Sequence, residues 1–380
     1  MVVRTGAQRL AEDRGLVPDG RLGLITNFTG VLPDLTPTSV ALRAAGLPLT
    51  ALFGPEHGLR GTAQAGASEG EGVDPDTGLP VFDTYLRQGR ELDELFSGVD
   101  VLLFDIQDIG TRFYTYVWTM YDCQQAAARL GMPFVVLDRP NPLGGVRVEG
   151  PLLQPGFESF VGRAPIPLRH GLTVGELARQ LGAATVVPMD GWTRDSAGTG
   201  MPTGMPTGLP WVPPSPNMPT PDTALVYPGT GLFEGTNLSE GRGTTRPFET
   251  IGAPYVDDRL VPALSACGLP GVIFRRTWFE PVFSKYAGQA VSGVQLHVVD
   301  RDAFEPVRTA LVMLRVLNEL YPDDFGMLPS LDRLWGSDSL RKALEAGDDP
   351  LDLLPAATTP AGWVRPDVLL YEGLYEGMAR

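Results

Sequence analysis

Cysteine and histidine are scarce in this chain of 380 residues, and their scarcity limits the chemistry available to it. Cys123 and Cys267 lie far apart and neither belongs to a CxxC pair, so the sequence gives no support to a zinc ribbon or a dithiol redox site. Cys123 falls in a helical run and is expected to be a small buried apolar residue. The histidines are His57, His170 and His297, which is little material for a metal centre.

Long apolar segments and an excess of basic residues are also missing. No stretch approaches the roughly 20 apolar residues of a membrane-spanning helix, and the amino terminus turns polar too soon for a signal peptide. As the chain stands, we expect a soluble protein without a membrane span and a cytoplasmic location. The net charge is −15, from 30 basic and 45 acidic residues. This balance argues against a nucleic-acid partner, although a local arginine cluster could still bind an anionic substrate.

The common signatures of nucleotide binding and serine catalysis are absent as well. No GxGxxG follows the first expected strand, and neither GxxxxGK[ST] nor GxSxG occurs. We therefore expect no cofactor and no resident metal. What the chain has in plenty is glycine and proline, 46 and 36 residues, spread without a short period. This distribution indicates structured loops rather than disorder.

Apolar strand-like segments alternate with helical ones through the first half of the chain. Strands are expected at 21–27, 49–53, 99–108, 132–141 and 185–189, and helices at 37–46, 114–131 and 173–181. This alternation predicts an α/β fold with a Rossmann-like, doubly wound parallel sheet. The strand at 99–108 has a continuous apolar centre, which is typical of a strand covered on both faces.

The alternation stops at residues 191–220, which are rich in proline and glycine and contain a tandem MPTG repeat. We interpret this segment as an extended loop between two domains. Beyond it, a strand at 291–300 and an amphipathic helix at 304–321 indicate a second, smaller α+β domain. The predicted domains are 1–220, carrying the catalytic residues, and 221–380, closing the cleft.

Polar residues follow the expected strands of the first domain. They are Asn27 after the first, Glu56 and His57 after the second, Asp105, Gln107, Asp108 and Arg112 after the third, and Asp138, Arg139 and Asn141 after the fourth. Open parallel sheets bind ligands outside the carboxyl ends of their strands, so four such ends predict one shared cleft. Glu56 is the strongest candidate, because it sits in a tight loop. Glu176 is excluded, because Thr173-x-x-Glu176 is typical of a capping box.

Acidic residues dominate the remaining candidates, namely Glu56, Asp105, Asp108, Glu149, Glu234 and Glu240. Glycoside hydrolysis commonly uses two carboxyl groups, one as acid and one as nucleophile or base. Two alternatives stay open. A metal-dependent hydrolase could use Glu56, His57, Asp108 and His170, and a noncatalytic glycan-binding protein could use the same cleft.

Several long segments resemble the NamZ-type exo-β-N-acetylmuramidases, a family once catalogued as a domain of unknown function. They include GLITNFTGV (23–31), ALFGPEHGLRG (51–61), VDVLLFDIQDIGTRFYTYVWTM (99–120), SFVGRAPIPLRHGLTVGELA (159–178) and LFEGTNLSEGRGTTRPFETIGAP (232–254). The resemblance implies a cleft between a Rossmann-like domain and a smaller one. It also implies release of N-acetylmuramic acid from non-reducing ends of peptide-free peptidoglycan fragments. Many relatives are exported, which leaves the location unknown, and the MPTG repeat departs from the family pattern.

The resemblance carries roles onto particular residues. Its EHG motif falls on Glu56 and His57, and the glutamate is the family's favoured catalytic candidate. A second motif falls on Asp105, Gln107, Asp108, Arg112, Tyr114 and Tyr116, and a third on Glu234, Asn237, Ser239, Glu240, Arg242 and Thr244.

These residues give a working hypothesis for the mechanism. Glu56 is the expected general acid, tuned by His57 or a neighbouring aspartate. Asp105 or Asp108 is the second carboxylate, and on a regular strand the two would face opposite ways. An arginine should bind the lactyl carboxylate of muramic acid. The candidates are Arg242, Arg139 and Arg112, and further substrate contacts are expected from Asn27, Gln107, Tyr114, Asn141, His170, Glu234 and Asn237.

Overall fold

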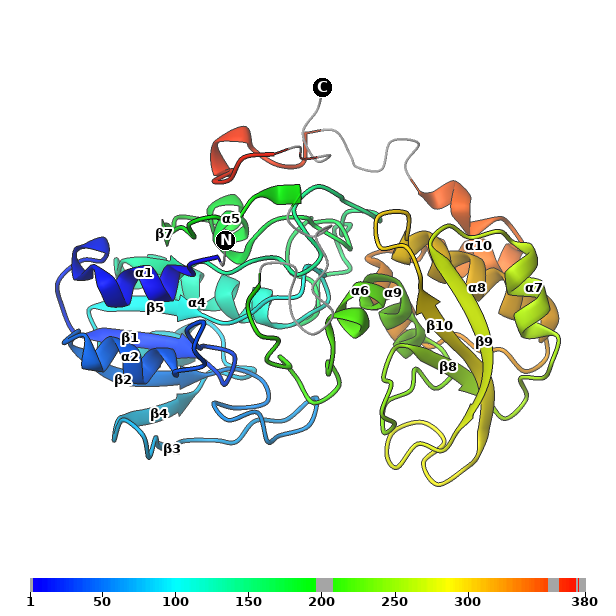
Figure 1. The fold of residues 1–380 in the computed structure, drawn as a ribbon, viewed down its shortest axis with the longest axis horizontal. Helices are drawn as coiled ribbons and strands as arrows, with labels where there is room; N and C mark the ends of the chain where they lie inside the picture. Colours follow the sequence, from blue (N-terminus) through cyan, green and yellow to red (C-terminus); the bar gives the residue numbers. More distant parts are fainter. Residues whose placement is uncertain (1–2, 196–207, 355–361, 374, 376–380) are drawn as a thin grey trace.

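The computed structural model describes residues 3–195, 208–354, 362–373 and 375, arranged in two lobes that lie side by side (Figure 1). A sheet with the order β3-β4-β2-β1-β5-β6-β7 forms the centre of the first lobe. Six strands run parallel: β1 (Leu22–Thr26), β2 (Leu49–Gly54), β4 (Pro80–Asp83), β5 (Val101–Asp105), β6 (Phe134–Leu137) and β7 (Thr185–Val187). The short edge strand β3 (Gly72–Val73) is antiparallel to β4. The predicted parallel sheet is confirmed.

Helices cover both faces of this sheet. One face carries α1 (Gly6–Glu12) and α2 (Thr38–Ala44), and the other carries α3 (Arg90–Phe96), α4 (Tyr116–Leu130) and α5 (Val174–Leu181). Alternate residues of β5 supply the two layers: Leu103 packs in the core under α1 and α2, while Leu102 and Phe104 pack in the core under α4. The continuous apolar centre of β5 is therefore explained by burial on both faces. Cys123 is buried in α4, as predicted.

The second lobe is built on a three-stranded antiparallel sheet with the order β8-β10-β9. Its strands are β8 (Thr250–Ala253), β9 (Val272–Phe279) and β10 (Val291–Val298). The helices are α6 (Pro221–Thr230), α7 (Leu260–Ala266), α8 (Pro306–Leu320), α9 (Ser330–Trp335) and α10 (Ser339–Ala346), with a short 3-10 helix η3 at Gly231–Gly235. The predicted strand at 291–300 and helix at 304–321 correspond to β10 and α8. No helix of the described residues is long and apolar enough to cross a membrane.

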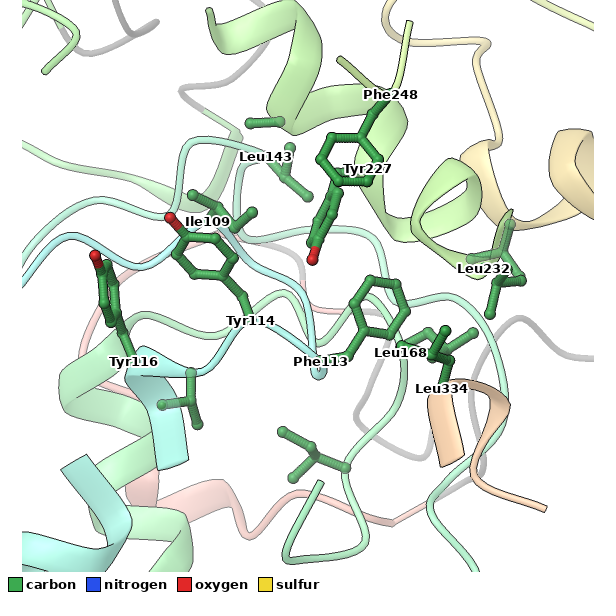
Figure 2. Packing of buried hydrophobic residues seen from close by; sticks show 14 of the residues in the cluster. Ile109, Phe113, Tyr114, Tyr116, Leu143, Leu168, Tyr227, Leu232, Phe248 and Leu334 are labelled. Carbon is green, nitrogen blue, oxygen red and sulfur yellow. The ribbon is translucent and has the colours of Figure 1, made fainter. Parts of the chain in front are cut away.

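The two lobes share one hydrophobic core where they meet. Phe113 of the first lobe packs edge to face on Tyr227 of α6, with the ring centres 5.1 Å apart. Figure 2 shows Leu334 from the end of α9 beside Phe113 and Leu168 of the first lobe. Because this contact is apolar and buried, it fixes α9 and α6 against the carboxyl edge of the large sheet.

The chain returns to the first lobe after α10. Residues 362–373 lie along α5, where Arg365 N donates to Gln180 Oε1 and Leu370 N donates to Glu176 Oε1 (Figure 1). The predicted division at residue 220 assigns this segment to the second domain, whereas it packs on the first lobe. Residues 196–207 of the loop predicted at 191–220, with most of the MPTG repeat, lie outside the described residues, while 208–220 form neither a helix nor a strand.

Candidate active site

The carboxyl ends of the central strands are tied together by hydrogen bonds. Thr26 Oγ1 at the end of β1 donates to the Asp105 carbonyl at the end of β5, over 2.9 Å. Gln107 N donates to Thr29 Oγ1, and its side-chain Nε2 donates to the Pro140 carbonyl after β6. These bonds hold the loops after β1, β5 and β6 in one place, which is the edge where the sequence predicts the site.

Glu56 lies in the loop that follows β2, and its side chain is largely buried. Its Oε1 accepts a hydrogen bond from Gly66 N over 2.7 Å, and its Oε2 lies 2.6 Å from Thr115 Oγ1 at the start of α4. A hydroxyl can donate or accept, so Thr115 can bond to the charged or the protonated carboxyl group. Thr115 was not identified from the sequence, because it is distant from Glu56 along the chain.

His57 adopts a left-handed backbone conformation, with φ of 72°. This region is strained for a residue with a Cβ and costs on the order of 1 kcal/mol or more. The loop holds it there through two bonds: His57 N donates to the Ala67 carbonyl, and Nδ1 lies 2.9 Å from the Ala63 carbonyl. Because a carbonyl only accepts, Nδ1 carries a proton. Strain of this kind, retained beside a buried carboxyl group, is typical of functional loops.

Asp105 is fully occupied by an arginine. Arg139 donates to both carboxylate oxygens, from Nε over 2.5 Å and from Nη2 over 2.8 Å, and neither side chain is appreciably exposed. Arg139 Nη2 also donates to the Val31 carbonyl. The pair therefore braces the edge of the sheet, and Asp105 has no free oxygen to offer a substrate.

Asp108 differs from Asp105 in having one fixed and one unpaired oxygen. Its Oδ2 accepts from Gly110 N over 2.8 Å and lies 3.2 Å from His170 Nε2. His170 Nδ1 accepts from Leu172 N, so the ring proton sits on Nε2, which makes no hydrogen bond of good geometry within the described residues. Among the described residues Asp108 Oδ1 is buried without a partner. Strand β5 ends at Asp105, so Asp108 belongs to a loop and the expected alternation of the two aspartates does not apply.

A row of aromatic rings runs from His57, next to Glu56, to the second lobe, and Figure 2 shows its members Tyr116, Tyr114, Tyr227 and Phe248. Successive ring centres are 6.4 Å apart for His57 and Tyr116, 5.1 Å for Tyr116 and Tyr114, 6.0 Å for Tyr114 and Tyr227, and 4.6 Å for Tyr227 and Phe248. All four contacts are edge to face, the arrangement that aromatic quadrupoles favour. The guanidinium of Arg242 ends the row, 5.0 Å from the ring of Phe248.

Tyr114 lies where charged groups from both lobes meet. Burial raises the pKa of its phenol, Asp108 and Glu56 raise it further, and Ser215 and Arg242 act in the opposite direction. The hydroxyl makes no hydrogen bond of good geometry within the described residues. An unsatisfied buried hydroxyl costs about 1–3 kcal/mol. Because Asp108, Glu56 and Arg242 all act electrostatically on this phenol, we take these residues together with Tyr114 as the candidate active site.

The second lobe contributes a cluster of paired charges. Arg242 Nε donates to Glu234 Oε1 over 2.9 Å and lies 3.4 Å from Glu240 Oε1, while Lys285 Nζ lies 2.9 Å from Glu240 Oε2. Burial raises the pKa of Glu234, and Arg242 opposes that rise. Burial lowers the pKa of Arg242, but Glu234, Tyr227 and Glu240 together leave the pKa raised. Arg242 therefore stays positively charged beside the aromatic row.

Four other predicted substrate contacts have backbone partners. Arg112 donates to the carbonyls of Pro151, Ile166, Leu334 and Trp335, two on each lobe. Asn141 bonds to Leu172 and Leu143, and Asn237 bonds to Asp324, Tyr255 and Gly326. Asn27 Oδ1 accepts from Thr29, while its Nδ2 is buried without a partner in the part of the chain described. These bonds give Arg112, Asn141 and Asn237 roles in shaping loops.

Two residues beside Glu56 were not singled out in the sequence. Phe160 and Arg163 line the same small cavity as Glu56. Arg163 forms an ion pair with Asp122 over 3.0 Å. Burial raises the pKa of Asp122 to about 6, against the lowering effect of Arg163. Both residues lie in the family-like stretch at 159–178, which was the available signal. In the ranges that the structure covers, no three His, Cys, Asp or Glu side chains are placed to hold a metal ion.

Sequence comparison gives the same family for both halves of the chain. A model described as exo-beta-N-acetylmuramidase NamZ, N-terminal, matches residues 22–222, and its C-terminal counterpart matches residues 225–360. Among characterised proteins, the chain is 48% identical over 359 residues to the peptidoglycan beta-N-acetylmuramidase NamZ of Bacillus subtilis. That match covers 91% of this chain and 85% of the relative.

Two solved structures from Bacteroides fragilis share the fold over nearly their whole length. Both are described as DUF1343 family proteins. The first is 36% identical, with a TM-score of 0.83, and the match covers 93% of this chain and 94% of the other. The second is 27% identical, with a TM-score of 0.73 and 93% of each chain covered.

Proposed function

The chain belongs to the NamZ family of exo-β-N-acetylmuramidases, and on that premise we propose that it hydrolyses a terminal N-acetylmuramic acid bond at the site around Tyr114. The substrate class is peptide-free peptidoglycan fragments with this sugar at their non-reducing end. The supporting observation is the row of ring contacts that joins the Glu56 loop to Arg242 through Tyr114, with Asp108 also acting electrostatically on the Tyr114 phenol. Hydrolysis of the glycosidic bond of an acidic sugar requires carboxyl groups and a cation close together at a site that excludes water.

Glu56 is the proposed general acid. Its proton passes to the glycosidic oxygen as the bond from that oxygen to the anomeric carbon breaks, so the leaving sugar departs as an alcohol. Thr115 Oγ1, 2.6 Å from Glu56 Oε2, keeps the carboxyl group in one orientation. The strained loop that contains His57 fixes the backbone of Glu56.

Asp108 is the proposed second carboxylate, because both oxygens of Asp105 are bound to Arg139. Gly110 N donates to Oδ2, His170 Nε2 lies 3.2 Å from the same oxygen, and Oδ1 has no partner among the described residues. Oδ1 either attacks the anomeric carbon or takes a proton from the water that does. His170 is proposed as a positioning residue, since it lies against Asp108 Oδ2.

Arg242 is the proposed contact for the lactyl carboxylate. Its side chain remains 18% exposed, whereas Arg139 is nearly buried on Asp105 and Arg112 is buried on four carbonyls. Glu234 and Glu240 hold the guanidinium in place at the end of the aromatic row. Arginine suits this contact because its planar fork matches a carboxylate.

The decisive assay compares a chromogenic β-N-acetylmuramide with the matching β-N-acetylglucosaminide, which lacks the lactyl group. We expect the wild-type protein to cleave the muramide and leave the glucosaminide nearly untouched. Glu56→Gln should lower muramide turnover at least about a hundredfold, the usual contribution of a general acid. Glu94→Gln, a change at an exposed helix position, is the matched control. A folded Glu56→Gln protein with near wild-type turnover would remove Glu56 from the mechanism.

The same assay separates the other two functions that the cleft could serve. A metal-dependent hydrolase would lose activity on treatment with a chelator and regain it with a divalent cation. A noncatalytic glycan-binding protein would bind the muramide without releasing the chromophore, and Glu56→Gln would leave binding unchanged.

A further inference from the structure

A groove of about 790 Å³ runs between the lobes beside the candidate site. One wall is the loop 156–161 of the first lobe, and the other is residues 329–334, which include most of α9. Figure 1 shows α9 on the side of the second lobe that faces the first. The volume is within the range of small-ligand sites and exceeds that of a single sugar ring.

The groove shares one lining residue with the small cavity around Glu56. Phe160 lines both the small cavity that contains Glu56 and the larger groove. Glu234 lines the groove as well, and it is the carboxylate that holds Arg242. The groove therefore leads away from the proposed general acid along the boundary between the lobes.

The walls combine an aromatic ring with hydrogen-bonding groups. Phe160 is 44% exposed, so its ring is available to a molecule in the groove. The tight turn that carries it is held by Ser159 N donating to the Gly162 carbonyl and Gly162 N donating to the Ser159 carbonyl. Arg333 and Glu158 lie on the rim and are exposed. An aromatic platform with polar groups around it suits a neutral sugar, which has an apolar ring face and a hydroxyl edge.

We propose that this groove binds the sugar on the reducing side of the bond that is cleaved, with Phe160 stacked on its ring. The proposal rests on the proposed function, because a general acid must lie next to the oxygen that the leaving sugar keeps. Phe160 shares a cavity with that acid, so the leaving sugar enters the groove at Phe160. In peptidoglycan the leaving sugar is N-acetylglucosamine, which is uncharged and fits a groove with both charge signs on its rim.

The test compares two leaving groups in one protein. We measure kcat/KM for methyl β-N-acetylmuramide, which places one carbon in the groove, and for the disaccharide with N-acetylglucosamine on the reducing side. Phe160→Ala should lower kcat/KM for the disaccharide about tenfold, near the upper end of an aromatic contact. The methyl glycoside should change less than about twofold, because it does not reach the ring. Phe160→Trp should restore most of the disaccharide activity.

Trp278→Ala is the matched control, since Trp278 is an exposed aromatic on β9 outside the groove. An equal loss on both substrates in Phe160→Ala, or the same loss in Trp278→Ala, would overturn the proposal. Saturation-transfer NMR with N-acetylglucosamine alone gives a second measurement that needs no catalysis. If N-acetylglucosamine binds to the wild-type protein and not to Phe160→Ala, the proposed role of the groove is supported. If the wild-type protein also cleaves neither muramide, only the proposed function is contradicted. Binding that is absent, or unchanged in the variant, counts against the groove.

Discussion

Asp105 and Asp108 are three positions apart and have opposite surroundings. Asp105 gives both oxygens to Arg139, while Asp108 keeps one oxygen unpaired near Tyr114. Asp108→Asn should therefore lower muramide turnover at least about a hundredfold while the melting temperature changes little. Asp105→Asn leaves Arg139 buried without its counter-ion, so it should lower the free energy of unfolding by about 3–5 kcal/mol.

Steady-state kinetics and thermal melts of the two variants check this contrast. Equal destabilisation by both changes would mean that Asp108 is a structural partner of His170 and not a reacting group. The sequence alone could not separate the two aspartates. It placed both at the end of one strand, but the partner of each is set by loops that arrive from β6 and from residue 170.

Arg112 shows how one side chain can join two elements. It bonds to Pro151 and Ile166 at the base of the 156–161 loop, and to Leu334 and Trp335 at the end of α9. These segments lead into the two walls of the groove, so we expect Arg112 to help set the spacing of the walls. Lysine has a single ammonium group and cannot reach carbonyls on both walls. Arg112→Lys should lower the melting temperature and raise KM for the disaccharide more than KM for the methyl glycoside.

Calorimetry and the two-substrate assay measure these effects. Arg333→Lys, which replaces a guanidinium group by an ammonium group on the rim of the groove, is the control. A stability loss with KM unchanged for both substrates would limit Arg112 to a role in folding.

Elements with strong local patterns could be predicted, and the others could not. Strands β1, β2, β5 and β6 have apolar runs because they are covered on both faces, and α8 has a clear amphipathic pattern. Strand β4 begins at Pro80 and lies near the sheet edge, so its run is short. Helix α9 has six residues, packs on η3 and α10 of its own lobe, and accepts two hydrogen bonds from Arg112 of the first lobe. The groove could not be predicted from the sequence, because tertiary contacts set the positions of both its walls.

The returning segment 362–373 extends the first lobe with a buried polar cluster. Tyr371 hydroxyl donates to Asp138 Oδ2 over 2.5 Å, and Thr173 and Gly175 donate to the same carboxylate. Burial raises the pKa of Asp138 to about 7, and Glu176 adds to the rise while Tyr371 opposes it. The capping box predicted at Thr173 and Glu176 is confirmed in the same cluster.

This raised pKa makes stability depend on pH. Unfolding returns Asp138 to a pKa near 4, so between about pH 4 and pH 7 the folded protein binds a proton that the unfolded chain releases. The contribution is fully present below about pH 4 and is lost as the pH rises through about 7. Asp138→Asn keeps the shape of the side chain and should flatten the fall in melting temperature over this range.

Melts of wild type and variant between pH 4.5 and 8 test this, with the exposed Asp302→Asn as control. Parallel curves for wild type and Asp138→Asn would assign the pH dependence to other groups.

The same segment has a consequence for the order of events during synthesis. Glu176 and Asp138 are translated before the second lobe exists, yet Leu370 and Tyr371, which bond to them, are translated after it. At ribosomal rates the interval between β7 and Tyr371 is about 10–40 s. During that time the first lobe lacks the residues that cover these two acids. A premature stop near residue 360 would therefore leave both lobes translated and the first lobe without this cover.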